Sequence, residues 1–268
     1  MKVTVITANK NGSRFLDEAI RSVLAQRGDG VDLEYIVVDG KSTDRSMEIV
    51  GQYRKEITAV ISEADNGPAA AINKGLRLAS GKLVSWLNAD DRLAPGALKR
   101  VLETAALYPA KSLFFGNCRI IDASGREIRR GISFFKTLFF PLSSRFTIQC
   151  INYISQPAMF FRNSALQNTG FLREDLLAAW DYDFVLRLWQ KGGAARIKGP
   201  PIADFRWHHA SISAGSYMTQ FEEEFNIAAK NAGYLALQTL IHAAVRWGIV
   251  GCYGLMAARG RRQREDRR

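Results

Sequence analysis

Short β-branched runs alternate with longer segments of helical period through the first half of the chain, which strongly constrains the fold. The runs predicted to be strands are Val3–Thr7, Glu34–Asp39, Ala59–Ser62, Leu83–Leu87 and Ser112–Gly116. The segments predicted to be helices are Phe15–Gln26, Arg45–Tyr53, Ala69–Ala79 and Pro95–Ala106. Strands that alternate with helices of this length predict an α/β fold, with a mostly parallel sheet covered by helices on both faces.

Composition supports a folded protein with anionic partners. Of the 268 residues, 47% are hydrophobic, which is enough to bury a full core, and the net charge of +11 favours phosphate-bearing ligands, anionic lipid or nucleic acid. Cys118, Cys150 and Cys252 show no paired spacing, so neither a disulfide framework nor a zinc ribbon is expected. No signal-peptide pattern precedes Val3, and a cytoplasmic location is therefore expected.

Polar and acidic residues follow four consecutive predicted strands. They are Asn9 and Asn11, then Asp39 to Asp44, then Asp65-Asn66, then Asn88-Ala89-Asp90-Asp91. Because the carboxyl ends of parallel strands meet at one edge of a sheet, these side chains are expected to lie together. A rim of carboxylates in a basic protein suggests a divalent cation that accompanies phosphates.

The sharpest of these motifs is Asn88-Ala-Asp90-Asp91, which follows the buried strand end Trp86-Leu87. Two adjacent carboxylates repel each other unless a hard cation such as Mg²⁺ or Mn²⁺ lies between them. The other reading, an acidic cap for the helix that starts near Pro95, stays open.

In their order along the chain, these motifs resemble family 2 glycosyltransferases of the GT-A fold. The residues that carry the resemblance are Val3 to Asn11, Ile36 to Asp44, Asn66-Gly67 with Asn73-Lys74-Gly75, and Asn88 to Asp91, and the match extends to Ser213. The nearest likeness is to bacterial exopolysaccharide and lipopolysaccharide enzymes. The resemblance implies a catalytic domain over residues 1–213, with a nucleotide-binding half at 1–117 and an acceptor half at 118–213.

The resemblance also implies roles for particular residues. A nucleotide-sugar, expected to be a UDP-sugar, is held by residues at the strand ends: Thr7, Asn9, Asp39, Asp65, Lys74, Asn88 and Asp90. The metal, Mn²⁺ or Mg²⁺, is expected on Asp90, with Asp91 as a second candidate ligand. Asn88 replaces the first acid of the family's DxD motif, which leaves the number of carboxylates on the metal open.

A second acidic motif, Trp180-Asp181-Tyr182-Asp183, precedes an apolar helical pattern. By the resemblance, Asp181 is the general base of an inverting transfer, and Asp183 is expected to cap the helix. Such a carboxylate takes the proton of the acceptor hydroxyl as its oxygen attacks the anomeric carbon. Gln156, in a further segment that resembles the family, is expected to face the acceptor.

A third polar cluster also resembles the family, which often has an Arg, a His and two serines at this spacing. Its members here are Arg206, His208, Ser211 and Ser213. A neutral imidazole at His208 would complete the metal shell or contact the diphosphate, and His209 is the adjacent alternative.

The region 214–268 is expected to form a helical segment with an arginine-rich end. Tyr234–Ala258 is long enough to span a bilayer, but His242 and Arg246 near its middle disfavour that. An interfacial helix on anionic lipid fits better, and an ordinary core-packing helix stays open. With the phenylalanine-rich segment Ile132–Phe146, this region suggests a peripheral enzyme on the cytosolic face of the bacterial inner membrane, with a saccharide or polyprenyl-linked acceptor.

The expected function is therefore metal-dependent, inverting sugar transfer in bacterial surface polysaccharide synthesis. A catalytically inactive relative and an anionic-lipid or nucleic-acid binding protein are the alternatives. No specific nucleic acid is expected, since no basic helix interleaved with aromatic residues occurs. A dinucleotide oxidoreductase is disfavoured, because the first strand is followed by Thr7-Ala-Asn9-Lys-Asn11-Gly12 rather than GxGxxG.

Overall fold

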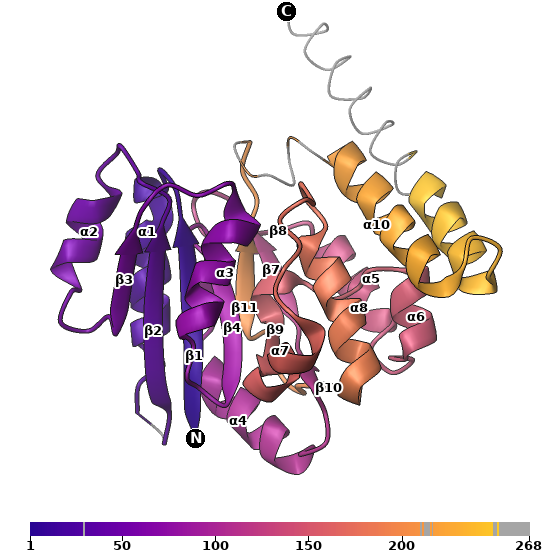
Figure 1. Cartoon of the computed structure of the whole chain (residues 1–268), viewed down its shortest axis with the longest axis horizontal. Helices are drawn as coiled ribbons and strands as arrows, with labels where there is room; N and C mark the ends of the chain where they lie inside the picture. Colours follow the sequence, from indigo (N-terminus) through magenta and orange to yellow (C-terminus); the bar gives the residue numbers. More distant parts are fainter. Residues whose placement is uncertain (29, 210, 212–214, 216, 249–250, 252–268) are drawn as a thin grey trace, which may run out of the picture.

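The computed structural model describes residues 1–28, 30–209, 211, 215, 217–248 and 251. Its centre is a seven-stranded sheet with the order β10-β6-β9-β4-β1-β2-β3 (Figure 1). The strands of this sheet are β1 (Lys2–Asn9), β2 (Asp32–Asp39), β3 (Ala59–Ser62), β4 (Leu83–Asn88), β6 (Leu113–Phe115), β9 (Met159–Arg162) and β10 (Ala194–Arg196). Neighbouring strands pair in parallel, except that β9 runs antiparallel to β4 and β6. The predicted mostly parallel sheet is therefore confirmed.

A second, four-stranded sheet has the order β5-β11-β7-β8. Its strands are β5 (Arg92–Leu93), β7 (Cys118–Ile121), β8 (Glu127–Ile128) and β11 (Ala203–Arg206). The sequence did not predict this sheet, whose strands have only two to four residues each. Its pairing of β5 with β11 brings the residues after β4 beside a segment that lies more than a hundred residues later in the chain.

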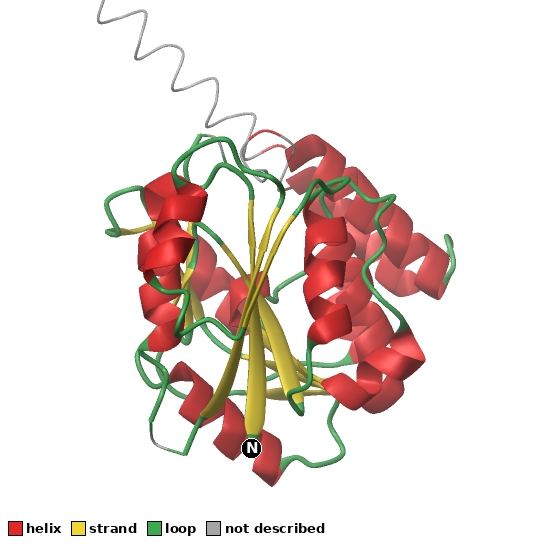
Figure 2. Ribbon diagram, turned by 60° about the vertical axis from the view of Figure 1, so that its left-hand side comes forward, coloured by secondary structure: helices red, strands yellow, loops and turns green. Residues whose placement is uncertain are grey.

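Helices cover both faces of the twisted central sheet, as Figure 2 shows. They are α1 (Ser13–Leu24), α2 (Ser46–Gln52), α3 (Pro68–Leu78), α4 (Ala97–Leu107), α5 (Arg130–Leu138), α6 (Arg145–Cys150), the 3₁₀ turn η1 (Gln156–Ala158), α7 (Asn163–Thr169), α8 (Trp180–Gly192) and α10 (Tyr217–Ala232). A further helix covers residues 237–248. The four helices predicted in the first half are all present, with ends shifted by one or two residues.

Alternate residues of the strands supply two hydrophobic cores, one on each face of the sheet. On β2, Val37 packs in the cluster that contains Ile20 of α1, whereas its neighbour Ile36 packs in the cluster that contains Ile72 of α3. This follows from the period of two in a strand, which sends successive side chains to opposite faces.

The predicted halves 1–117 and 118–213 share one sheet, since β9 and β10 of the second half pair with strands of the first. The described part of 214–268 is helical, and it packs on the same body. Ile227 and Ala228 of α10 are buried in one cluster with Leu188 of α8. The C-terminal helices therefore belong to the fold that positions the site.

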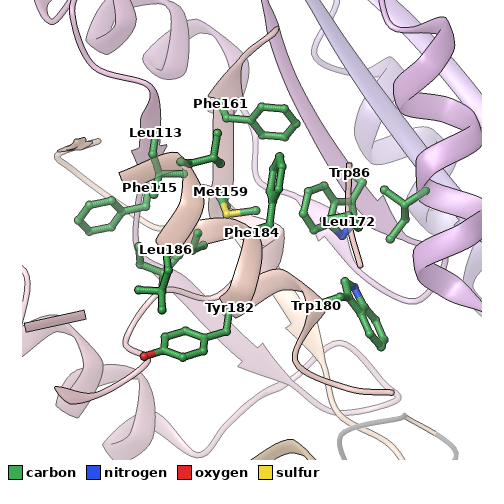
Figure 3. Close-up of a cluster of buried hydrophobic side chains, with 14 of the residues drawn as sticks. Trp86, Leu113, Phe115, Met159, Phe161, Leu172, Trp180, Tyr182, Phe184 and Leu186 are labelled. Atoms are coloured by element: carbon green, nitrogen blue, oxygen red, sulfur yellow. The ribbon is translucent and has the colours of Figure 1, made fainter. Parts of the chain in front are cut away.

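Aromatic side chains join α8 to the central sheet (Figure 3). Phe184 of α8 packs edge-on against Phe161 of β9, with ring centroids 4.9 Å apart, and lies 6.0 Å from the ring of Trp86 on β4. Trp86 lies two residues before Asn88, and Phe184 three residues after Asp181. The cluster therefore sets the position of the second acidic motif relative to the first.

Candidate active site

The polar strand ends meet at one edge of the sheet, as predicted. The parallel register pairs Asn9 of β1 with Asp39 of β2, and Ala8 with Asn88 of β4. Three of the polar motifs therefore lie side by side at the carboxyl ends of the strands, where ligands bind in open α/β sheets.

Asn9 and Asp39 form a buried hydrogen-bonded corner. Asn9 Nδ2 donates to Asp39 Oδ1 at 2.7 Å, and Ser42 donates to the same carboxylate from its backbone N and its Oγ. Asp39 is fully buried, and its carboxylate holds the loop after β2 in place; its contact with a nucleotide stays a prediction. In the described chain, the Oδ1 atom of Asn9 is one of the few buried side-chain atoms without a hydrogen-bond partner, which leaves an acceptor in this corner.

Thr7, also predicted to contact the nucleotide, lies deeper in the fold. Its side chain is fully buried, and its Oγ1 lies 2.9 Å from the hydroxyl of Tyr35. Thr7 lies two residues before the end of β1, on the same face as Asn9, and its hydroxyl contacts the interior in this structure.

Asp65 and Lys74 lie together beside the loop after β2. Asp65 Oδ2 lies 2.6 Å from the point that a Cβ on Gly40 would occupy, so glycine at position 40 allows this carboxylate to approach. Lys74 Nζ donates to the carbonyl of Ala64 at 2.8 Å and lies 3.0 Å from Glu63 Oε1. Lys74 thus contacts the two residues that precede Asp65, and the predicted nucleotide contacts of Asp65 and Lys74 stay predictions.

Asn88 links the acidic motif to Gln156. Its Nδ2 donates to Gln156 Oε1 and to Asp91 Oδ2, both at 3.3 Å, while Gln156 Nε2 donates to the carbonyl of Trp86 at 2.7 Å. Gln156 therefore lies at the end of β4, and the amide pair holds η1 against the motif.

Asp91 does not have the surroundings of a metal ligand. Its side chain is buried. Asp91 Oδ1 accepts from the backbone N of Arg206 at 2.9 Å, and Oδ2 accepts from Asn88. Burial, and then the neighbouring Asp90 carboxylate, raise the pKa of Asp91 well above its ordinary value. The second of the two predicted carboxylates is thus turned into the fold, which corrects that expectation.

Asp90 and His208 meet at the rim of the site. Asp90 Oδ2 lies 3.0 Å from His208 Nε2, and both side chains are partly exposed. A carboxylate and an imidazole suit Mn²⁺ or Mg²⁺ only together with further oxygen ligands, which the phosphates of a nucleotide would provide. Among the described residues, no group of three or more His, Cys, Asp or Glu side chains could hold a metal ion by itself. The residues present fit a site that is completed by its ligand.

The small sheet and one buried arginine hold this pair in place. Arg206 Nε donates to the carbonyl of Asp90 at 2.8 Å, and its Nη2 donates to Glu18. The ring of Phe15 lies 4.6 Å from the guanidinium carbon of Arg206 and 5.2 Å from the ring of His208. Arg206 is 1% exposed, so this member of the third cluster lies beneath the rim and supports the site from within the fold.

The rest of the third cluster supports His208. Ser211 Oγ accepts from the backbone N of His208 at 3.1 Å. His209 is exposed and packs on Trp207, so His208 is the histidine that faces Asp90. Ser213 lies outside the described residues.

Asp181 lies in the first turn of α8. Burial, and then the negative charge of Glu224, raise its pKa to about 6, while Tyr182 N donates to its Oδ1 at 2.7 Å. The helix begins at Trp180, and its N-cap makes no side-chain hydrogen bond. Asp183 therefore lies inside the helix, where it pairs with Arg187 one turn later at 2.8 Å, and the predicted capping role was wrong.

Two charged residues near Asp181 were not predicted. Glu224 of α10 is 4% exposed and accepts from Asn152 and Gln220, each at 3.0 Å. Lys136 of α5 donates to Ser155 Oγ at 3.1 Å, and burial lowers its pKa. Glu224 lies three and four residues before the apolar Ile227 and Ala228, a helical spacing that could have shown it to be buried.

Glu223, next to Glu224, holds the segment that leads into α8. Its carboxylate accepts from the backbone N of Leu177, Ala178 and Ala179 at 2.8, 2.9 and 2.9 Å. Ala179 is the N-cap of α8, so these three bonds fix the start of the helix that carries Asp181. A run of three glutamates would ordinarily indicate a solvated surface, and no local signal in the sequence points to this contact.

Comparison with known sequences places the chain among sugar-transferring proteins. The sequence model of Glycosyl transferase family 2 matches residues 4–170. The putative teichuronic acid biosynthesis glycosyltransferase TuaG of Bacillus subtilis is 36% identical over 219 residues, which cover 80% of this chain and 82% of TuaG. The poly(ribitol-phosphate) beta-N-acetylglucosaminyltransferase TarS of Staphylococcus aureus is 25% identical over 229 residues, which cover 82% of this chain and 37% of TarS.

An uncharacterized glycosyltransferase of Nostoc is 39% identical over 106 residues, or 38% of this chain and 32% of that protein. The alignments thus span about a third of the length of the Nostoc and TarS proteins.

Solved structures share the fold. TarS 1–349 of S. aureus in complex with UDP-GlcNAc has a TM-score of 0.69 at 19% identity, and the match covers 91% of this chain and 71% of that one. The mannosyltransferase PcManGT from Pyrobaculum calidifontis, in complex with GDP-Man and Mn²⁺, has a TM-score of 0.63 at 20% identity, covering 96% and 79%.

Proposed function

The chain belongs to glycosyl transferase family 2, and we propose that it transfers a sugar, with inversion, from a UDP-sugar to a saccharide or lipid-linked acceptor. The product would be a bacterial surface polysaccharide, made at the cytosolic face of the inner membrane. The observation that carries the proposal is the meeting of Asp90 and His208 at the carboxyl edge of the sheet.

The donor site is inferred from the residues around this edge. The corner of Asn9 and Asp39 and the loop with Asp65, which Lys74 contacts, lie along the ends of β1 to β3, where we place the nucleoside. Asp90 and His208 would hold Mn²⁺ or Mg²⁺ at the diphosphate. When bound, the metal would offset the negative charge that develops on the leaving nucleoside diphosphate.

Asp181 is the proposed general base. In an inverting transfer, the acceptor oxygen bonds to the anomeric carbon as the bond to the nucleoside diphosphate breaks, and the hydroxyl proton passes to a carboxylate. A pKa of about 6 leaves Asp181 ionised near neutral pH and a better proton acceptor than an ordinary aspartate. The aromatic contacts of Phe184 with Phe161 and Trp86 hold its helix toward the donor edge.

The relatives support the choice of donor and acceptor class. The TarS structure contains UDP-GlcNAc, and the PcManGT structure contains GDP-Man with Mn²⁺. A Campylobacter jejuni relative, 34% identical over 123 residues, is named as a glucosyltransferase acting on an undecaprenol-linked glycan. These ligands belong to those proteins, and we infer the class for this chain.

The test is thermal stabilisation of the whole chain by UDP, GDP, dTDP and their common sugars, each with Mn²⁺ and with EDTA. Ligands that bind only the native state raise the melting temperature, so a site is detected without a known acceptor. We expect a shift with UDP and UDP-sugars that EDTA removes. An unchanged melting temperature with every nucleotide would contradict the proposed donor site.

A further inference from the structure

The segment between the two acidic motifs contains a helix with unusual surroundings. Helix α5 has the sequence Arg-Gly-Ile-Ser-Phe-Phe-Lys-Thr-Leu, and each of its nine residues is exposed or half-buried, Lys136 among the half-buried ones. Phe134 and Leu138 are 65% and 52% exposed, and the following Leu142 is 67% exposed. Exposed aromatic and aliphatic side chains in such density mark an interaction surface.

A second exposed apolar set lies on the C-terminal helical region. Of the seventeen large hydrophobic side chains exposed in the described chain, five lie between Phe134 and Phe146 and five between Tyr234 and Trp247. The two stretches make up a small part of the chain, so exposure of this kind is concentrated there.

The two stretches are neighbours in space. His242 Nδ1 lies 2.8 Å from the carbonyl of Gln149, and Gln149 Nε2 donates to Asn231 at 2.7 Å. A hollow of about 290 Å³ is lined by side chains of α6, α10 and the last helix, including Phe146 and Gln238. We call the exposed residues of 130–147 and 234–247 the apolar–basic face.

Positive charge exceeds negative charge in the segments that carry this face. Residues 122–150 contain five Lys or Arg against two acids, which pair with Arg126 and Arg130, and residues 230–248 contain Lys230 and Arg246 with no acid. In the described chain, no helix combines the length and the apolar character needed to cross a bilayer. Exposed apolar side chains in segments of net positive charge suit an anionic lipid surface, where apolar groups enter the headgroup boundary and cations meet phosphates.

Helix α5 joins this face to the site. Phe134 and Leu138 are four residues apart on one side of the helix, and Lys136, midway between them, points the opposite way. Lys136 donates to Ser155, the residue before Gln156. We propose that the apolar–basic face docks on an anionic bilayer surface and so presents a lipid-linked acceptor to Asp181. This inference rests on the proposed function.

The test is flotation of the whole chain with phosphatidylcholine vesicles, with and without phosphatidylglycerol. We expect binding to the anionic vesicles only, weakened by salt, and at least about tenfold weaker for the triple variant Phe134→Gln, Leu138→Gln, Leu142→Gln. The matched control, Leu78→Gln, Leu107→Gln, Tyr108→Gln, removes exposed apolar side chains elsewhere and should bind as wild type does.

The proposal is overturned if the wild type binds neither vesicle type, or if the triple variant binds anionic vesicles as well as the control variant does. It is also overturned if sedimentation shows that the wild type is a dimer and the triple variant a monomer, because a second copy of the chain then covers the face. Thermal stabilisation by UDP with Mn²⁺ is measured on the same samples. If the triple variant keeps this rise in melting temperature but loses vesicle binding, the result supports docking through the apolar–basic face. If UDP with Mn²⁺ does not raise the melting temperature of the wild type, the result contradicts only the proposed donor site.

Discussion

Asp90 Oδ2 lies 3.0 Å from His208 Nε2, although 118 residues separate the two in the chain. Three tertiary contacts bring them together: the pairing of β5 with β11, the hydrogen bond from Arg206 Nε to the carbonyl of Asp90, and the ring of Phe15 beneath His208. Each is buried or partly buried, so the pair is held ready before any ligand binds.

His208→Ala is expected to weaken Mn²⁺-dependent UDP binding by about 10-fold or more, because loss of even an outer-shell partner of a metal costs about 10-fold to 100-fold in affinity. Titration calorimetry with UDP and Mn²⁺ measures the effect. His209→Ala is the matched control, since His209 is exposed and faces Trp207. Equal losses in both variants would argue against His208 as a ligand.

Asp181→Asn is expected to lower the rate of transfer by about 1,000-fold or more, since no group then takes the acceptor proton. The UDP thermal shift should stay as in the wild type. The raised pKa of Asp181 means that the fold favours its protonated form over its charged form. The stability that the protonated form contributes is therefore lost as pH rises from about 4 to about 6. The variant should therefore melt higher than wild type at pH 7.5. Asp183→Asn, which breaks the pair with Arg187, is the comparison and should retain transfer.

The value of kcat/KM should fall at low pH with an apparent pKa of about 6, because protonated Asp181 cannot act as a base. Glu224→Gln removes a neighbouring negative charge that raises the pKa of Asp181, so this acid limb should move to lower pH. Rates over pH 5 to 9 test both points. An acid limb that does not move would show that Glu224 acts only through packing.

Glu223→Ala removes three hydrogen bonds to the segment before α8 and should lower kcat more than it changes the KM for donor. Glu223→Gln keeps one side-chain oxygen and should recover part of the loss. Glu222→Ala serves as control, because Glu222 is exposed on the same helix. The prediction fails if Glu222→Ala and Glu223→Ala give the same kcat.

Two glycine substitutions should change stability in opposite directions. A Cβ on Gly75 of α3 would lie 2.4 Å from Ile6 Cγ2 in the core, so Gly75→Ala should destabilise the fold by about 1–3 kcal/mol. Gly51→Ala in α2 meets open space and should stabilise by up to about 1 kcal/mol through helix propensity. Urea unfolding of both variants provides the measurement.

The parts of the site that the sequence predicted are those built from local pattern. Asn9, Asp39 and Asn88 could be assigned to one edge because each directly follows a β-branched run, and parallel strands end together. Asp65 and Lys74 were expected beside the base and the phosphates of the nucleotide; Asp65 lies in the loop after β3, and Lys74 contacts that loop.

The sequence could not show which way each of these side chains faces. Asp90 and Asp91 are adjacent acids, yet one meets His208 at the rim and the other is buried against Arg206. Thr7 and Asp39 follow the same strand-end pattern as Asn9, but their oxygens pair with Tyr35 and Ser42 inside the fold. Composition and spacing carry no information about these internal partners.

By itself, the sequence determined the alternation of strands and helices, the mostly parallel sheet and the edge at which its polar residues gather. These follow from periods of two and about 3.6 residues and from turn residues, which act over a few positions. Only the tertiary structure decided that β5 pairs with β11, so that His208 meets Asp90, and that Glu223 and Glu224 face the helix of Asp181. Such contacts join residues far apart in the chain, and burial and register in the packed fold select them.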